Sequence, residues 1–488
     1  MSDTAEFASQ VLLVAAVGIL ALLSNRLTER IKIPAPLLVL VAAAVAVQAI
    51  PAVHQPPERT VERLVTVALV CILFNGGLHM GARRVREAAV PILVIGVLGT
   101  FLTAGAIAVF IHAAVGLDWF PSLLIATAIS PTDPAVVFSV LGQREVSGRS
   151  GTILEGESGA NDPVGIALMA SLIAAGGVSG GAFVHIAAEF TLQMGVGALV
   201  GVVGGRALLW FMRAVPLPSE GLYALRTAAG VLVLYGAATL AHGSGFLAVF
   251  VAGILLGDAR APYKREIERF HSALASLGEI VAFVVLGLTV DLAELTRLDV
   301  WVPGVAIAAV LAFVVRPVFV GLCLLPARLE RNERAFVLFA GLKGAVPILL
   351  GSFILADHVA GAERLYAIVV VVVLFSVLVQ GSLVPSVAGW LHLPMRTAEP
   401  QPWALGVRLA DEPESAHQLT VTPGSPADGR RIDDLDCLPE DAWLSLVVRD
   451  GRLLPVRGDS ELRAGDVVLV IADPDEADAL TATFTAPA

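Results

Sequence analysis

The sequence predicts an all-α polytopic membrane protein with about thirteen transmembrane helices and a small α/β (β-rich) domain at its C-terminus. Three observations predict this fold class. The 488 residues are 56% hydrophobic and 15% charged, with a mean hydropathy of +0.81, whereas soluble domains are about 45–50% apolar and about 25% charged. Apolar segments long enough to cross a bilayer recur over the first four-fifths of the chain. The remaining residues are polar and acidic.

The predicted spanning helices follow one another with short connections. They lie near residues 8–24, 35–50, 61–80, 89–113, 120–142, 152–176, 186–212, 223–241, 244–258, 270–290, 302–325, 334–357 and 364–388. Cytoplasmic connections carry an excess of Lys and Arg. Seventeen basic residues fall on one set of alternate connections, and four on the other: Arg59, Arg63, Arg297 and Arg364. We therefore expect the N-terminus outside, the C-terminal domain in the cytoplasm, and a location in the cell (inner) membrane.

Charge and composition divide the chain into three parts. Residues 1–395 have a net charge of −1, and residues 396–488 have a net charge of −10. We expect a transmembrane domain over 1–394, a linker rich in Pro, Glu and Ala over 395–417, and a soluble domain over 418–488. So acidic a tail does not favour binding to nucleic acid. The three cysteines share no motif spacing, so the sequence supports neither a disulfide framework nor a zinc site.

Short β-branched segments alternate with turn signals in the C-terminal domain. Leu444–Val448 is a predicted strand, and Asp450-Gly451 after it suits a tight hairpin turn. Val467–Ile471 is a second predicted strand, preceded by Gly465-Asp466. The pattern indicates a compact β-rich domain.

The helix near 120–142 carries an interruption, Ser130-Pro131-Thr132-Asp133-Pro134. Its two prolines remove helical N–H donors and disfavour the helical backbone before them. A helix that opens in a membrane must line a cavity or lie buried in protein. Half-helix ends near the bilayer midplane are a recurring way for transporters to hold ions. A simple proline kink is the alternative, which Asp133 inside the interruption disfavours.

The next helix places several polar side chains at helical spacing. Glu157 and Asn161 are four residues apart on one face, and Ser158 and Asp162 are four apart on the adjacent face. Because buried carboxylates are costly in a membrane, we interpret these residues as lining an ion- or water-filled cavity. The alternative places Glu155 and Glu157 at the helix N-terminus, where the helix dipole favours them.

A second interruption, Gly341–Pro347, lies in the helix near 334–357 and contains Lys343. A lone cation in an apolar setting needs a carboxylate, and Glu157 is the predicted partner. The interrupted helices are the fifth and twelfth of thirteen, which correspond if helices 1–6 and 8–13 are inverted repeats. Glu279 and Arg316 are further embedded charges, interpreted as members of structural pairs rather than as substrate ligands.

These motifs resemble those of the sodium (potassium)/proton antiporter family in the monovalent cation:proton antiporter superfamily. Glu155–Pro163 resembles its Asn-Asp motif helix, Thr132-Asp133-Pro134 its unwound helix, and Gly341–Pro347 its second broken helix. The resemblance extends over about residues 10–390. Residues 419–471 resemble the TrkA-C subdomain of regulator-of-potassium-conductance proteins, a combination similar to the potassium/proton branch.

The resemblance implies a function and a role for each motif residue. The protein would exchange K⁺, or alternatively Na⁺, for protons by alternating access, as a homodimer in the lipid bilayer. Asp162 would bind either the proton or the cation, and Asn161 would stabilise it without titrating. Asp133, the Thr132 backbone and Ser158 would complete the ion shell. The pair of Glu157 and the residue at 343 would hold the core together.

Two positions depart from the family pattern. In Leu73-Phe74-Asn75-Gly76-Gly77, the family often has a carboxylate where Asn75 stands, and its core cation is more often Arg than Lys343. Asn75 is therefore only an accessory candidate. The other accessory candidates are Glu155, Glu279 and Arg316. Because Asn161 rather than a second Asp precedes Asp162, the simplest expectation is one-for-one electroneutral exchange.

No cofactor is expected in the membrane region. The tail resembles domains that bind ligands as dimers, so a nucleotide or cyclic dinucleotide is its expected regulator, and a passive dimerisation module is the alternative. A ligand-gated cation channel is the rival function, although the chain shows no repeated carbonyl-rich filter loop. An enzyme is not expected, because nucleophile-elbow, metal-ligand and phosphate-loop motifs are absent from the sequence.

Overall fold

The structure is a computed structural model that describes residues 18–19, 35–49, 55–141, 144–146, 149–177, 180–327, 329–393, 395–397, 416–435, 438–439, 442–449, 452–473 and 476–485. The chain separates into two compact units, here called the membrane unit (Met1–Ala404) and the tail unit (Leu405–Ala488). The predicted first helix near 8–24, apart from residues 18–19, and most of the predicted linker lie outside the described residues.

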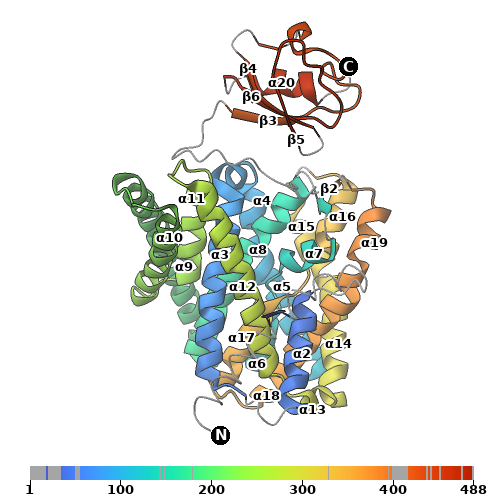
Figure 1. The fold of residues 1–488 in the computed structure, drawn as a ribbon. Helices are drawn as coiled ribbons and strands as arrows, with labels where there is room; N and C mark the ends of the chain where they lie inside the picture. The colour runs from blue at the N-terminus through green and yellow to red at the C-terminus, as the bar shows by residue number, and fades with distance from the viewer. Residues whose placement is uncertain are drawn as a thin grey trace. The chain divides into compact units, whose positions relative to one another are not determined.

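The membrane unit is a bundle of helices, as predicted (Figure 1). In chain order they are α2 (Ala35–Ala49), α3 (Glu58–Glu87), α4 (Ala89–Leu93), η1 (Val94–Gly99), α5 (Thr100–Phe110), η2 (Ile111–Val115), α6 (Trp119–Ala128), α7 (Pro134–Leu141), α8 (Arg149–Ala175), α9 (Gly180–Ala214), α10 (Glu220–Leu240), α11 (Gly245–Gly257), α12 (Lys264–Leu288), α13 (Leu292–Leu295), α14 (Leu298–Val310), η3 (Leu311–Val320), α15 (Gly321–Cys323), α16 (Arg331–Phe339), α17 (Ala345–Ala356), α18 (Ala362–Phe375), η4 (Ser376–Gly381) and α19 (Ser382–Trp390).

Within the described part of the chain, seven helical runs are long and apolar enough to cross a membrane. They are Glu58–Arg86, Ala89–Val115, Gly181–Ala214, Glu220–Leu240, Lys264–Leu288, Leu298–Cys323 and Ala362–Trp390. Shorter apolar helices are Pro36–Ala49, Trp119–Ala128, Gly245–Gly257 and Ala345–Ala356. Two of these shorter helices, Trp119–Ala128 and Ala345–Ala356, each border one of the two predicted interruptions. The polytopic all-α prediction is confirmed.

Several of the long runs change to π-helical geometry along their length. η1 and η2 lie in the run that begins at α4, η3 continues α14, and η4 continues α18. A π-helical stretch widens the hydrogen-bonding pattern by one residue and is frequently found at functional sites. Both η3 and η4 contribute side chains to the site described below.

The centre of the membrane unit is formed by α6, α8 and α17, which contact one another. Figure 1 shows α9 and α10 along one edge of the bundle, and α14 and α19 along the opposite edge. Most of α8 is buried, including Glu157, Ser158, Asn161 and Asp162. A helix that is buried on all sides lies in the core of a bundle rather than against lipid.

Glycines allow α3 and α11 to pack closely. A Cβ at Gly253 would overlap the backbone of Phe74, and a Cβ at Gly77 would overlap the backbone of Phe250. Small residues at helix contacts are a common way for membrane helices to associate. This close contact places α3, with Asn75, firmly against its neighbour.

The tail unit holds a four-stranded antiparallel sheet in the order β3-β6-β4-β5. The strands are β3 (Ala416–Thr420), β4 (Trp443–Arg449), β5 (Arg452–Leu454) and β6 (Val467–Ile471), with η5 (Ile432–Asp434) and α20 (Ala477–Phe484). Arg449 pairs with Arg452 at the end of the antiparallel pair of β4 and β5. The predicted Asp450-Gly451 turn lies outside the described residues. Leu480 and Phe484 of α20 are buried with the sheet residues Val468 and Val470. The predicted β-rich domain is confirmed.

Candidate functional site

The first interruption is a true opening of the helix. α6 ends at Ala128 and α7 begins at Pro134, and residues 129–133 between them, here called the first break, are not helical. Pro134 is the first residue of α7, a position where the missing N–H costs nothing. The prediction of a local opening is confirmed.

The second interruption has the same form. α16 ends at Phe339, α17 begins at Ala345, and residues 340–344, here called the second break, are not helical. Pro347 lies in the first turn of α17, where proline is tolerated, rather than inside the break. The break is therefore formed by the Gly341–Gly344 part of the predicted motif.

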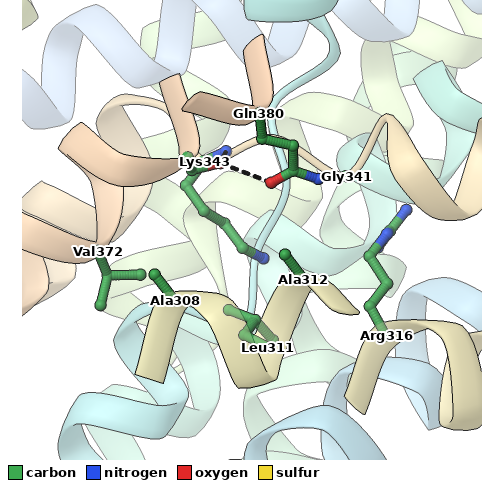
Figure 2. A pocket seen from close by; sticks show the side chains of 9 residues that line it. Ala308, Leu311, Ala312, Arg316, Gly341, Lys343, Val372 and Gln380 are labelled. Carbon is green, nitrogen blue, oxygen red and sulfur yellow. Dashed lines mark hydrogen bonds between the residues drawn. The ribbon is translucent and has the colours of Figure 1, made fainter. Parts of the chain in front are cut away.

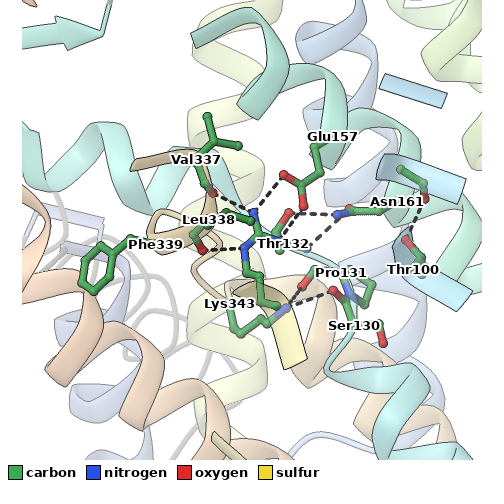
Figure 3. Close-up of polar contacts among 12 residues, drawn as sticks. Thr100, Ser130, Pro131, Thr132, Glu157, Asn161, Val337, Leu338, Phe339 and Lys343 are labelled. Atoms are coloured by element: carbon green, nitrogen blue, oxygen red, sulfur yellow. Dashed lines mark hydrogen bonds and ion pairs between the residues drawn. The ribbon is translucent and has the colours of Figure 1, made fainter. Parts of the chain in front are cut away.

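Hydrogen bonds join the two breaks where they cross. The Asp133 N–H donates to the carbonyl of Leu342 at 2.8 Å. The Lys343 ammonium donates to the carbonyls of Ser130 at 2.9 Å and Pro131 at 3.0 Å (Figure 3). Lys343 thus places a positive charge on carbonyls that follow the C-terminal end of α6, which the helix dipole favours.

The Asp133 carboxylate lies at the opposite kind of helix end. Its Oδ1 accepts the N–H of Ala135 at 2.9 Å in the first turn of α7. A Cβ at Gly344, just before α17, would overlap the same carboxylate. One negative charge therefore lies at the N-terminal ends of two helices, where a carboxylate is stabilised.

Asn161 fastens the first break to α8. Its amide nitrogen donates to the Thr132 hydroxyl at 2.8 Å, and its amide oxygen accepts the Thr132 N–H at 3.4 Å (Figure 3). Asn161 and Thr132 are 2% and 5% exposed, so the contact is inside the protein. The structure thus brings together two of the residues predicted from separate helices.

Asp162 is a buried carboxylate with an unused oxygen. It is 7% exposed, and Ser158, which lies one turn earlier in α8, is near enough to influence it electrostatically, as are Asp133 and Lys343. Its Oδ1 has no hydrogen-bond partner among the described residues. A buried acceptor without a partner is costly, so a bound proton or cation there would remove the cost.

The predicted pairing of Glu157 with Lys343 is wrong. Glu157 forms a two-armed ion pair with Arg316 of η3, from Nη1 to Oε1 at 2.6 Å and from Nη2 to Oε2 at 2.9 Å. The planar guanidinium matches both carboxylate oxygens, which a single ammonium cannot do. The Lys343 ammonium instead donates its hydrogen bonds to carbonyls of the first break. The interpretation of Arg316 as a member of a structural pair is confirmed.

The alternative reading of Glu155 and Glu157 as residues at a helix start is also wrong. α8 begins at Arg149, earlier than predicted, so both carboxylates lie beyond its first turn. Among the other accessory candidates, Asn75 on α3 has a buried Oδ1 with no partner in the described part of the chain. Glu279 on α12 lies near enough to Asp133 to interact with it electrostatically.

Two polar residues were missed in the sequence. Ser376 and Gln380 lie on η4, buried at 4% and 3% exposure. They line a cavity of about 10 Å³ together with Arg316, Gly341 and Lys343 (Figure 2). Two polar residues four apart in an otherwise apolar segment are the signal that could have identified them.

A larger cavity of about 220 Å³ lies away from the breaks. Its lining includes four carboxylates, Glu58, Asp291, Glu294 and Glu363. It also includes Thr289 and Tyr366, whose hydroxyls are 2.7 Å apart. The residues predicted to bind the ion do not line this cavity.

Comparisons with known proteins agree on the family. Residues 12–390 match the family model described as sodium/hydrogen exchanger, transmembrane, and residues 416–485 match the TrkA-C domain. The chain is 33% identical over 410 residues to the K(+)/H(+) antiporter NhaP of Alkalimonas amylolytica, covering 83% of this chain and 71% of that protein. It is 32% identical over 429 residues to the K(+)/H(+) antiporter NhaP2 of Shewanella oneidensis, covering 86% and 73%.

Other relatives are more distant. The Na(+)/H(+) antiporter NhaH of Halobacillus aidingensis is 28% identical over 300 residues, covering 58% of this chain and 72% of that protein. The solved sodium proton antiporter MjNhaP1 of Methanocaldococcus jannaschii has the same fold, with a TM-score of 0.66 and 19% identity, covering 78% of this chain and 100% of that chain. These matches give no support to the channel alternative. From the match over residues 12–390, this chain belongs to the sodium/hydrogen exchanger family.

Proposed function

We propose that the protein exchanges a monovalent cation for protons across the cell membrane by alternating access, with Asp162 as the carboxylate for which proton and cation compete. The observation that carries the proposal is the position of Asp162. Its carboxylate is buried beside two crossing broken helices and has one oxygen without a partner among the described residues. Broken helices at the substrate site are typical of secondary transporters.

The site provides the chemistry that such exchange needs. A bare carboxylate is costly to bury, and either a proton or a cation neutralises it. Ser158, Asp133 and the Thr132 backbone would supply oxygen ligands beside Asp162, and Asn161 holds Thr132 in place. Only the loaded site would change its exposure from one side to the other, because an empty charged site is unfavourable within the membrane.

The proposed cation is K⁺, with Na⁺ as the alternative. NhaP and NhaP2, which are at least 30% identical to this chain and cover most of it, are named K(+)/H(+) antiporters, and the more distant NhaH is named a Na(+)/H(+) antiporter. The TrkA-C domain in this chain also favours potassium. Since Asn161 beside Asp162 does not titrate, we propose one-for-one, electroneutral exchange.

In everted membrane vesicles with an acid interior, KCl is expected to release protons, as seen by recovery of fluorescence of a pH-sensitive dye. NaCl is expected to give a smaller response and choline chloride none. Clamping the membrane potential at two values is expected to leave the rate unchanged if exchange is electroneutral. An equal response to all three salts would contradict coupled cation exchange, and a rate that follows the potential would contradict the stoichiometry.

We further propose that the N-terminus lies outside, that the tail unit is cytoplasmic, that the chain is a homodimer, and that the tail binds a nucleotide or cyclic dinucleotide that regulates exchange. Addition of ATP or of cyclic dinucleotides to the full chain is expected to raise its thermal midpoint and to change its transport rate. The regulatory proposal fails for these ligands if both the midpoint and the rate are the same with and without them.

A further inference from the structure

The second break leaves backbone groups that must find partners inside the protein. The last carbonyls of a helix have no partner within it, and lipid offers none. Arg316 donates to the carbonyls of Val337 at 3.0 Å and Leu338 at 2.8 Å, near the end of α16. The carbonyl of Phe339 and the N–H of Lys343, on either side of the break, are met by side chains of η4.

Ser376 and Gln380 connect these two backbone groups through one chain of hydrogen bonds. The Lys343 N–H donates to the Ser376 hydroxyl oxygen at 3.1 Å. That hydroxyl donates to the Gln380 amide oxygen at 3.3 Å, and the Gln380 amide nitrogen donates to the Phe339 carbonyl. Both ends of the second break are thus attached to the same turn of η4. Figure 2 shows the Gln380 amide beside Lys343 and Gly341.

The same segment controls the crossing with the first break. Leu342 accepts the N–H of Asp133, and the Lys343 ammonium holds two carbonyls of the first break. The cavity between η3, η4 and the second break is about 10 Å³, which is room for about one water molecule. A cavity of this size cannot hold enough water to replace both hydrogen bonds to η4, so a second break that loses them must change position to find other partners.

We propose that Ser376 and Gln380 are positioning residues for ion exchange, which hold both ends of the second break so that Leu342 and Lys343 meet the first break in the binding geometry. They act through the backbone of Phe339 and Lys343 and are not themselves ion ligands. This inference rests on the proposed function, and it adds to the site two residues that carry no charge.

The test compares four substitutions in the vesicle assay. Gln380→Leu keeps the approximate size and removes both hydrogen bonds, and Ser376→Ala removes the hydroxyl. Gln380→Glu is informative because a protonated carboxyl can donate to the Phe339 carbonyl and accept from Ser376, as the amide does, whereas a carboxylate can only accept. Ser376→Thr keeps the hydroxyl and should therefore retain the exchange activity of wild type.

We expect Gln380→Leu and Ser376→Ala to lower the exchange rate about tenfold or more at every pH, the size expected when a buried polar group loses its partner. Relative to wild type at the same pH, Gln380→Glu should be at least about fivefold more active at pH 6 than at pH 9, because its donor is lost on ionisation. Gln193→Leu on α9 and Ser382→Ala on α19 are matched controls. Among the described residues, the Gln193 side-chain amide and the Ser382 hydroxyl form hydrogen bonds only within their own helical segment, and both variants should behave as wild type.

Wild-type rates in Gln380→Leu and Ser376→Ala would overturn the inference while leaving the proposed function intact. Equal impairment of Gln380→Leu and Gln380→Glu at both pH values would also overturn it, because shape alone would then explain the loss. A wild-type protein without any cation-dependent proton release would instead count against the proposed function. Size-exclusion profiles of the purified variants separate loss of transport from loss of folding.

Discussion

Vesicles that carry the Asp162→Asn variant are expected to release no protons on addition of KCl or NaCl, a loss of about 100-fold or more against wild type. The amide is close in size to the carboxylate, so the buried surroundings of Asp162 should persist. The variant cannot take up a proton or balance the charge of a cation. A cation without its counter-charge inside the membrane costs several kcal/mol, and each ~1.4 kcal/mol is a factor of ten in rate.

The matched control for this experiment is Asp118→Asn. Asp118 precedes α6 at the surface of the membrane unit, and its side chain does not cap the helix. Its replacement removes one carboxylate from the same region of the chain and should leave exchange unchanged. A wild-type response in Asp162→Asn would mean that the binding carboxylate lies elsewhere and that the mechanism built on it is wrong.

Breaking the ion pair between Glu157 and Arg316 is expected to have the largest effect on stability. Both side chains are 3–4% exposed, and the pair has short, two-armed geometry. Glu157→Gln or Arg316→Met would leave an uncompensated charge in the core. Removal of one partner of a buried pair costs about 3–5 kcal/mol. We expect a large fall in the thermal midpoint of the detergent-purified protein and poor recovery from the membrane.

The double variant Glu157→Gln with Arg316→Met distinguishes the pair from two separate effects. Because no charge remains unpaired, its midpoint should lie well above that of either single variant. Arg297→Met is the matched control, since Arg297 pairs with Asp299 where both side chains are about half exposed. Exposed pairs contribute little, so its midpoint should stay near that of wild type. Single variants as stable as wild type would show that the pair is not structural.

The breaks were predictable because their causes are local. Proline at positions 131 and 134 and glycine at 341 and 344 disfavour a continuous helix whatever surrounds them. Helical spacing also placed Ser158, Asn161 and Asp162 on neighbouring faces of one helix. Together these local rules identified both breaks and the carboxylate beside them.

The partner of Glu157 was not predictable by the same reasoning. Two buried cations, Lys343 and Arg316, are each far from Glu157 in sequence, and helical spacing does not say which helix lies opposite. The guanidinium geometry and the demand of the first break for the Lys343 ammonium decide the pairing. The π-helical turn of η4, which directs Ser376 and Gln380 to the second break, likewise depends on tertiary packing.

The hydrogen bonds between the two breaks have a kinetic consequence. Asp133 and Lys343 each tie one segment to the other, so the segments cannot separate unless these bonds are broken. The two breaks would therefore move together as a rigid body. A cation enclosed there would keep the same oxygen ligands throughout its passage and would regain water only on the far side. The barrier to turnover would then be the sliding of that rigid body past its neighbours rather than a second dehydration of the ion.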